Sequence, residues 1–158
     1  MWPHGDLSTL FSVMYSTFKL KKTRSLHINL NPSTFPYRQT VLNQFAKLGY
    51  SNLPPKNYLD YLTELSQYRF CLCVRGAGLD LHRAYEAWYL NSIPVIINNT
   101  ETKMDNFIKH LKQLNLPFYE IKGYNFDKYT PEFFNESLYN SLKNNSFNLP
   151  PLKLSYYQ

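Results

Sequence analysis

Two short apolar runs near the middle of the 158-residue chain constrain its fold most strongly. The first, residues 69–74, ends in an Arg-Gly-Ala-Gly loop at residues 75–78, and a helix-length segment separates it from the second run, the β-branched residues 93–97. Short apolar runs bounded by turn signals are typical of strands that are buried on both faces. A strand, a helix and another strand in this order predict a parallel pair joined by a crossover helix.

The same alternation continues on both sides of this centre. Apolar or alternating segments predict four strands, at residues 26–30, 70–74, 94–97 and 118–121. Helical spacing, capping residues and helix-starting prolines predict helices at residues 7–18, 36–48, 81–91, 104–114 and 130–142, and a further helix after Pro54-Pro55. We therefore expect an α/β fold, a Rossmann-like parallel sheet with helices on both faces.

Composition and charge exclude several classes of protein. Hydrophobic residues make up 44% of the chain and charged residues 18%, which is not the composition of a disordered polyelectrolyte. No run of about 18 apolar residues predicts a membrane span, and the first residues lack the pattern of a signal peptide. We therefore expect a cytoplasmic protein, whose net charge of +6 permits anionic partners.

Two further features have ordinary structural interpretations. Cys71 and Cys73 rule out a disulfide framework, and without a further ligand cluster they predict small core residues rather than a metal site. The basic run at residues 19–24 is interpreted as a solvated linker, so nucleic acid is not expected as a partner.

The loop after the first central run carries groups that suit a phosphate. Parallel sheets bind ligands beyond the carboxyl ends of their strands, and a helix that begins after Asp80 would present free N–H groups there. Arg75 and Arg83 could donate to a diphosphate. Glu86, one helical turn from His82, could accept hydrogen bonds from a pair of sugar hydroxyls.

Each of these features also has a purely structural alternative. A glycine pair after a strand is most often only a turn, and Asp80 with Arg83 can be a helix cap and a charge pair. His82 with Glu86 can be a surface contact. A dinucleotide-binding Gly-x-Gly-x-x-Gly is absent because Leu81 stands at its last position, and no nucleophile elbow occurs.

Residues 70–95 (FCLCVRGAGLDLHRAYEAWYLNSIPV) resemble the donor-binding core of exostosin-like glycosyltransferases, most closely the ribitol xylosyltransferase-like and viral members. The family pattern is a strand ending in Cys-Pro-Arg-Gly-x-Gly, then Asp-x-His-Arg, then Glu-Ala, then Ile-Pro-Val. The matching positions are Cys73, Arg75, Gly76, Gly78, Asp80, His82, Arg83, Glu86, Ala87, Ile93, Pro94 and Val95.

The resemblance is strongest over residues 58–99, and residues 2–6 resemble the segment that joins the two domains of the family. Three positions depart from the pattern. Val74 replaces a proline, Ala77 replaces an asparagine and Asn91 replaces a glycine. Asn91 can still adopt the left-handed conformation that glycine would supply.

The resemblance implies the C-terminal, donor-binding half of a two-domain GT-B glycosyltransferase. Such an enzyme transfers a sugar from a nucleoside diphosphate sugar to a hydroxyl acceptor. The implied partners are the nucleotide sugar as co-substrate, an acceptor glycan and an N-terminal half that this chain lacks. The implied donor-binding residues are Arg75, Gly76, Gly78, Asp80, His82, Arg83 and Glu86, with no cofactor and no metal.

The corresponding domain organisation has three parts. Residues 1–24 are expected to form a linker segment with a short helix, residues 25–146 the Rossmann-like domain that binds the nucleotide sugar, and residues 147–158 a tail. The alternative is a non-catalytic α/β module that binds an anionic ligand or partner. Whether the chain alone is an enzyme or an inactive fragment stays open between these two hypotheses.

Overall fold

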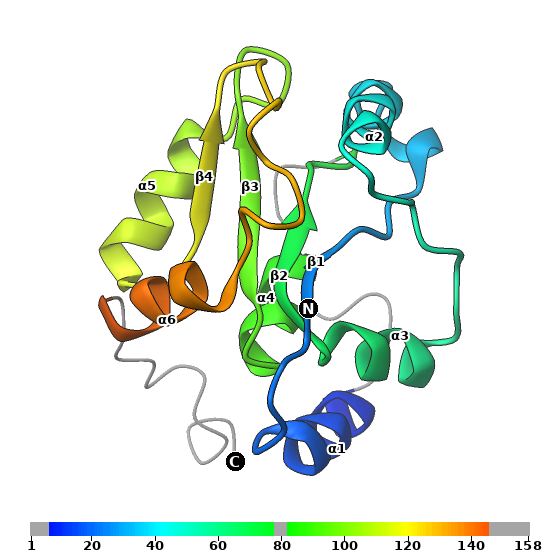
Figure 1. The fold of residues 1–158 in the computed structure, drawn as a ribbon, viewed down its shortest axis with the longest axis vertical. Coiled ribbons are helices and arrows are strands. Elements are labelled where there is room, and N and C mark those ends of the chain that lie inside the picture. The colour runs from blue at the N-terminus through cyan, green and yellow to red at the C-terminus, as the bar shows by residue number, and fades with distance from the viewer. Residues whose placement is uncertain (1–6, 78–81, 146–158) are drawn as a thin grey trace.

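The computed structural model describes residues 7–77 and 82–145, in which four strands form one sheet (Figure 1). The strands are β1 (Arg24–His27), β2 (Tyr68–Cys73), β3 (Ile93–Asn98) and β4 (Tyr119–Lys122). All neighbouring pairs are parallel and the spatial order is β1-β2-β3-β4, so the two central runs of the sequence are the inner strands. The predicted α/β fold with a Rossmann-like parallel sheet is confirmed.

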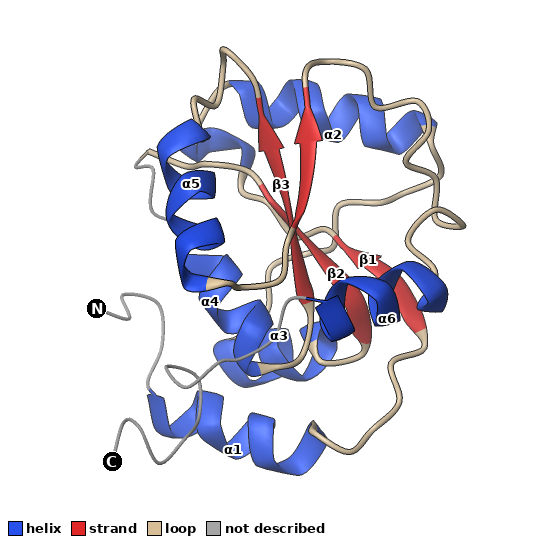
Figure 2. Cartoon of the chain, turned by 90° about the vertical axis from the view of Figure 1, so that its left-hand side faces the viewer, coloured by secondary structure: helices blue, strands red, loops and turns tan. Residues whose placement is uncertain are grey.

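Helices cover both faces of the sheet, as Figure 2 shows. They are α1 (Leu7–Thr17), α2 (Tyr37–Lys47), α3 (Tyr58–Leu65), α4 (His82–Tyr89), α5 (Asp105–Leu114) and α6 (Glu136–Asn145), with a short 3-10 turn η1 (Pro32–Thr34). Helices α1, α3, α4 and α5 pack into one core and α2 and α6 into the other. Because consecutive strands are neighbours, crossovers of one hand place α3, α4 and α5 on a common face.

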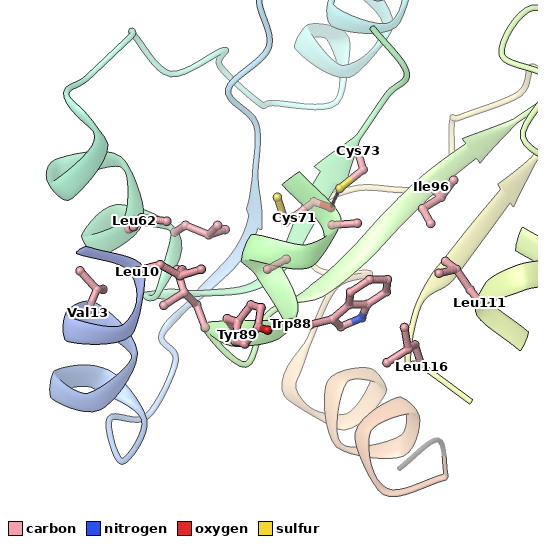
Figure 3. Packing of buried hydrophobic residues seen from close by; sticks show 14 of the residues in the cluster. Leu10, Val13, Leu62, Cys71, Cys73, Trp88, Tyr89, Ile96, Leu111 and Leu116 are labelled. Carbon is pink, nitrogen blue, oxygen red and sulfur yellow. Dashed lines mark hydrogen bonds between the residues drawn. The ribbon is translucent and has the colours of Figure 1, made fainter. Parts of the chain in front are cut away.

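Helix α1 is an integral part of the first core. Leu10 and Val13 of α1 are buried beside Leu62 of α3, and Trp88 of α4 extends the same cluster toward β3 (Figure 3). The Trp88 indole N–H donates to the carbonyl of Pro117 at 2.7 Å, so its polar atom is satisfied inside the core. The described part of the predicted linker segment is therefore packed against the sheet domain.

The second core contains many aromatic rings. Phe45 of α2 and Phe70 of β2 are fully buried, together with Phe126 and Phe134 from the segment between β4 and α6. The rings of Phe70 and Phe134 lie 5.0 Å apart between centroids. Burying a side chain of this size contributes about 1.5–3 kcal/mol.

Several predicted boundaries differ from the structure. Strand β1 covers residues 24–27 rather than 26–30, because the chain pairs early with the segment before β2 and the Arg24 N–H bonds the Gln67 carbonyl. The predicted start of the last helix was wrong. Helix α6 begins at Glu136, where the Asn135 side chain accepts a hydrogen bond from the Leu138 N–H, and not at residue 130.

The structure also bears on further details of the sequence interpretation. Asn91 has φ +59°, which confirms the left-handed conformation expected of it. On α3, Leu59 is 53% exposed, and Tyr61 packs against the first core. Within residues 7–77 and 82–145, no helix is both long enough and apolar enough to cross a bilayer. Residues 2–6 and the predicted tail at 147–158 lie outside the described residues.

Candidate functional site

A cleft of about 920 Å³ opens at the carboxyl ends of β1 and β2. This is the end of the sheet toward which the strand arrows point in Figure 1, and it is where parallel α/β sheets bind ligands. Polar groups line it from the loops after β1 and β2, the start of α2, the loop between α2 and α3, and the facing sides of α3 and α4. They include Asn29, Asn31, Arg38, Lys56, Tyr58, Tyr61, His82, Arg83 and Glu86.

The structure brings together part of the predicted donor site. Gly76, His82, Arg83 and Glu86 all line the cleft. Arg75 does not line it. Its guanidinium lies over the ring of Phe35, 4.6 Å from the centroid. Gly78 and Asp80 lie outside the described residues.

Glu86 is a buried carboxylate held by two tyrosines. It is 6% exposed and accepts hydrogen bonds from the hydroxyls of Tyr58 at 2.7 Å and Tyr61 at 3.0 Å. Burial raises the pKa of Glu86, although the tyrosine hydrogen bonds and the nearby Arg83 charge act in the opposite direction. Each carboxylate oxygen accepts from a different tyrosine and keeps a further lone pair for a ligand hydroxyl.

Arg83 connects α4 to the end of β1. Its guanidinium donates to the carbonyl of Asn29 and lies over the ring of Tyr61, 5.5 Å from the centroid. Tyr61 therefore contacts both charged groups of α4, accepting the Arg83 cation on its ring face and donating its hydroxyl to Glu86. These contacts fix one positive and one negative charge on neighbouring turns of a single helix.

Arg38 is a cleft residue that the sequence interpretation missed. Its guanidinium donates to three carbonyls at the strand ends: Val74 at 2.7 Å, Arg75 at 3.0 Å and Asn31 at 3.2 Å. Burial and the positive charge of Arg83 lower the pKa of Arg38 to about 10. The two arginines therefore repel each other at one end of the cleft, and an anion between them would relieve that repulsion.

Gly76 makes room for this arrangement. A Cβ atom at this position would lie 3.3 Å from Nη2 of Arg38 and 3.5 Å from Oγ1 of Thr34. The only signal for Arg38 in the sequence was its place in the first turn of a helix that follows a strand, which is the usual location of ligand groups in parallel sheets.

A buried histidine and two buried cysteines lie near the cleft: Cys73 lines it, and His27 packs against Tyr61, which also lines it. His27 is fully buried, and its Nε2 lies 3.0 Å from Oε1 of Glu64, while its Nδ1 has no hydrogen-bond partner among the described residues. Cys71 and Cys73 are buried free thiols, which confirms them as core residues. In the described part of the chain, no three metal-ligating side chains of the His, Cys, Asp or Glu type cluster together.

Comparisons with known proteins add no relative. No protein-family model matches the chain, and no curated protein matches it either.

Proposed function

We propose that the chain is the donor-binding domain of a glycosyltransferase of the exostosin-like type and holds a nucleoside diphosphate sugar in the cleft. The observation that carries the proposal is the meeting of Arg38, Arg83 and Glu86 in one cleft at the carboxyl ends of β1 and β2. A nucleoside diphosphate needs cationic donors for its phosphates and an acceptor for its ribose hydroxyls, and this cleft offers both.

The diphosphate is assigned to the Arg38 and Arg83 end of the cleft. The first turn of α4 adds His82, which lines the cleft, and the start of a helix carries a partial positive charge that suits a phosphate. In the transfer reaction the bond from the sugar to the diphosphate breaks, and fixed positive charge stabilises the leaving phosphate oxygen. The arginines are already held by backbone carbonyls, so little reorganisation is needed when that charge develops.

The ribose is assigned to Glu86. The Tyr58 and Tyr61 hydroxyls hold the carboxylate in one orientation, so its remaining lone pairs point in defined directions. A ribose diol can donate one hydroxyl to each carboxylate oxygen, whereas a single alcohol makes one of these two hydrogen bonds, so the site favours a diol.

The acceptor and a general base are assigned to a further domain. Apolar side chains on and just after α1, namely Leu7, Tyr15, Phe18 and Leu20, are exposed by between 40% and 64%. Exposed apolar side chains in one region are frequent where another protein surface docks. Helix α1 lies toward the end of the sheet opposite the cleft (Figure 1), so this surface is not where a domain completing the cleft would dock. The assignment of the acceptor and the base to a further domain therefore rests on the family resemblance.

A non-catalytic module for an anionic ligand is the second candidate. Two observations favour it: Arg75 does not line the cleft and lies over Phe35, and both oxygens of Glu86 already accept hydrogen bonds from tyrosines. In this case the arginine pair would bind an anion without reading a nucleoside.

Calorimetric titration separates the two candidates. The chain would be titrated with a panel of nucleoside diphosphates, with the matching nucleosides and with inorganic pyrophosphate. The proposal expects one nucleoside diphosphate to bind at least roughly tenfold more tightly than pyrophosphate, because the ribose contact adds a charged hydrogen bond. Equal binding of pyrophosphate favours the module, and absence of binding by any phosphate compound contradicts both candidates. The chain by itself is expected to release little nucleoside diphosphate from the matching sugar nucleotide, because the acceptor and the general base are assigned to a further domain.

A further inference from the structure

A second hollow, of about 190 Å³, lies at the opposite end of the sheet from the cleft. It is formed by the residues just before or at the start of β1, β2 and β3, together with α6 and the end of α1. We call it the basal pocket, and its lining consists of Thr17, Phe18, Leu20, Lys21, Lys22, Arg69, Asn91, Glu136, Tyr139, Asn140 and Lys143. In Figure 1, α1 and α6 lie toward this lower end of the sheet.

The charges of the basal pocket are unbalanced. Four cationic side chains line it against one carboxylate, Glu136, which pairs with the exposed Lys21 at 3.5 Å. Among the described residues, no carboxylate lies within ion-pair distance of Lys22 or Lys143. The ammonium of Lys143 lies instead over the ring of Tyr139, 5.5 Å from its centroid.

The Lys22 amine is held in one position, unlike that of a mobile surface lysine. Its ammonium donates to the carbonyl of Ser66, at the end of α3, at 2.6 Å, and to the carbonyl of Leu90, just after α4, at 2.7 Å. An ammonium has three donors, so one stays available for a ligand. Arg69 supports the same wall by donating to the carbonyls of Phe134 and Lys22.

We propose that the basal pocket binds a tetrahedral oxyanion, either a free phosphate or sulfate ion or the phosphoryl group of a small metabolite, between Lys22 and Lys143. The two ammonium groups repel each other across a hollow whose one described carboxylate, Glu136, pairs with Lys21 instead, and an anion converts this repulsion into two attractions. The volume admits such an ion with several water molecules, since one water occupies about 30 Å³ of liquid.

The protonation of Lys22 gives this site a measurable signature. Burial and the charge of Lys143 lower the pKa of Lys22 to about 7. The charged and titratable groups that face it in the pocket are Lys21, Arg69, Glu136, Tyr139 and Lys143. A bound anion favours the charged amine and raises its pKa, so binding above neutral pH takes up a proton, and binding at pH 6 does not.

Sulfate is the suitable first probe, because it does not itself titrate near neutral pH. Amide NMR shifts of Asn91 and Asn140 would report the basal pocket, and those of Asn31 and Ala77 would report the cleft, so that binding at the two places is separated. Lys143→Met is the test variant. Lys112→Met, an exposed lysine of α5, is the matched control with the same loss of charge.

The proposal expects sulfate to shift Asn91 and Asn140 in the parent and in the Lys112→Met variant. Affinity should fall roughly tenfold or more in Lys143→Met, the loss expected for one charged hydrogen bond. Calorimetry in buffers of different ionisation enthalpy should show proton uptake at pH 8 in the parent. Glycerol phosphate that binds as well as sulfate identifies a phosphoryl group as ligand, and weaker binding identifies the free ion. Unmoved Asn91 and Asn140 amides, or equal affinity in both lysine variants, would overturn the proposal.

Discussion

The Nη2 atom of Arg38 lies 3.3 Å from the place that a Cβ on Gly76 would occupy, and the same atom donates to the Val74 carbonyl at 2.7 Å. A methyl group at Gly76 would therefore press on the guanidinium and displace it by a few tenths of an ångström. Gly76→Ala should weaken nucleoside diphosphate binding several-fold, with a loss of stability of about 1 kcal/mol. Calorimetric titration and urea unfolding measure the two effects.

A double-mutant cycle with Arg38→Lys shows whether the effect passes through Arg38. The shorter, non-planar lysine leaves space beside residue 76, so Gly76→Ala should cost little in the Arg38→Lys background. Additive losses would mean that Gly76 acts through another contact.

Arg38→Lys by itself should destabilise the fold and the site together. The substitution keeps the charge but removes donors to the carbonyls of Val74, Arg75 and Asn31. We expect a loss of about 1–3 kcal/mol in the free energy of unfolding and roughly tenfold weaker nucleoside diphosphate binding. Arg24→Lys, an exposed arginine at the start of β1, serves as the control and should change neither quantity appreciably.

The strands and most helices could be predicted because their signals are local. The inner strands β2 and β3 are short apolar runs, and Asn91 reaches the left-handed conformation at the position where a glycine was expected. The start of α6 was missed for a tertiary reason. Phe134 is fully buried against Phe70 and Tyr119, and this packing holds the segment after Pro131 in turns until Asn135 caps the helix.

The candidate site was predictable only where one segment supplied it. His82, Arg83 and Glu86 lie within five residues of sequence, so helical spacing sufficed to group them. Arg38 and Tyr58 come from helices far away in the chain, and their contacts depend on how α2 and α3 pack. Arg75 was expected in the site because of its motif, but in the structure its guanidinium lies over the ring of Phe35 and does not line the cleft.

Lys22 should make stability depend on pH above neutrality. Its pKa is about 7 in the folded chain against an ordinary 10.5, so the unfolded chain binds more protons between these values. Stability should therefore rise with pH from about 7 upward, by at most about 1.4 kcal/mol per pH unit. Urea unfolding between about pH 6.5 and 9.5 measures this slope and stays below the ordinary pKa of tyrosine.

The Lys22→Met variant should lose this slope, and Lys112→Met should keep it. Because Lys22→Met also leaves the Ser66 and Leu90 carbonyls without their donor, its absolute stability is not the criterion. An unchanged slope in Lys22→Met would show that another group carries the pH dependence.

Glu86→Gln should change the pH dependence of stability and should weaken nucleoside diphosphate binding. Burial raises the pKa of Glu86 above its ordinary value of 4.5, so the stabilisation linked to its protonation is fully present below pH 4.5 and is lost as pH rises through the folded value. The neutral amide does not undergo this loss. The free energy of unfolding of the variant minus that of the parent should therefore be more favourable to the variant at pH 7 than at pH 4. Nucleoside diphosphate binding at pH 7 should fall roughly tenfold. Glu101→Gln, an exposed carboxylate, should alter neither comparison. Binding that survives Glu86→Gln unchanged would remove Glu86 from the ribose site, whatever the stability measurements give.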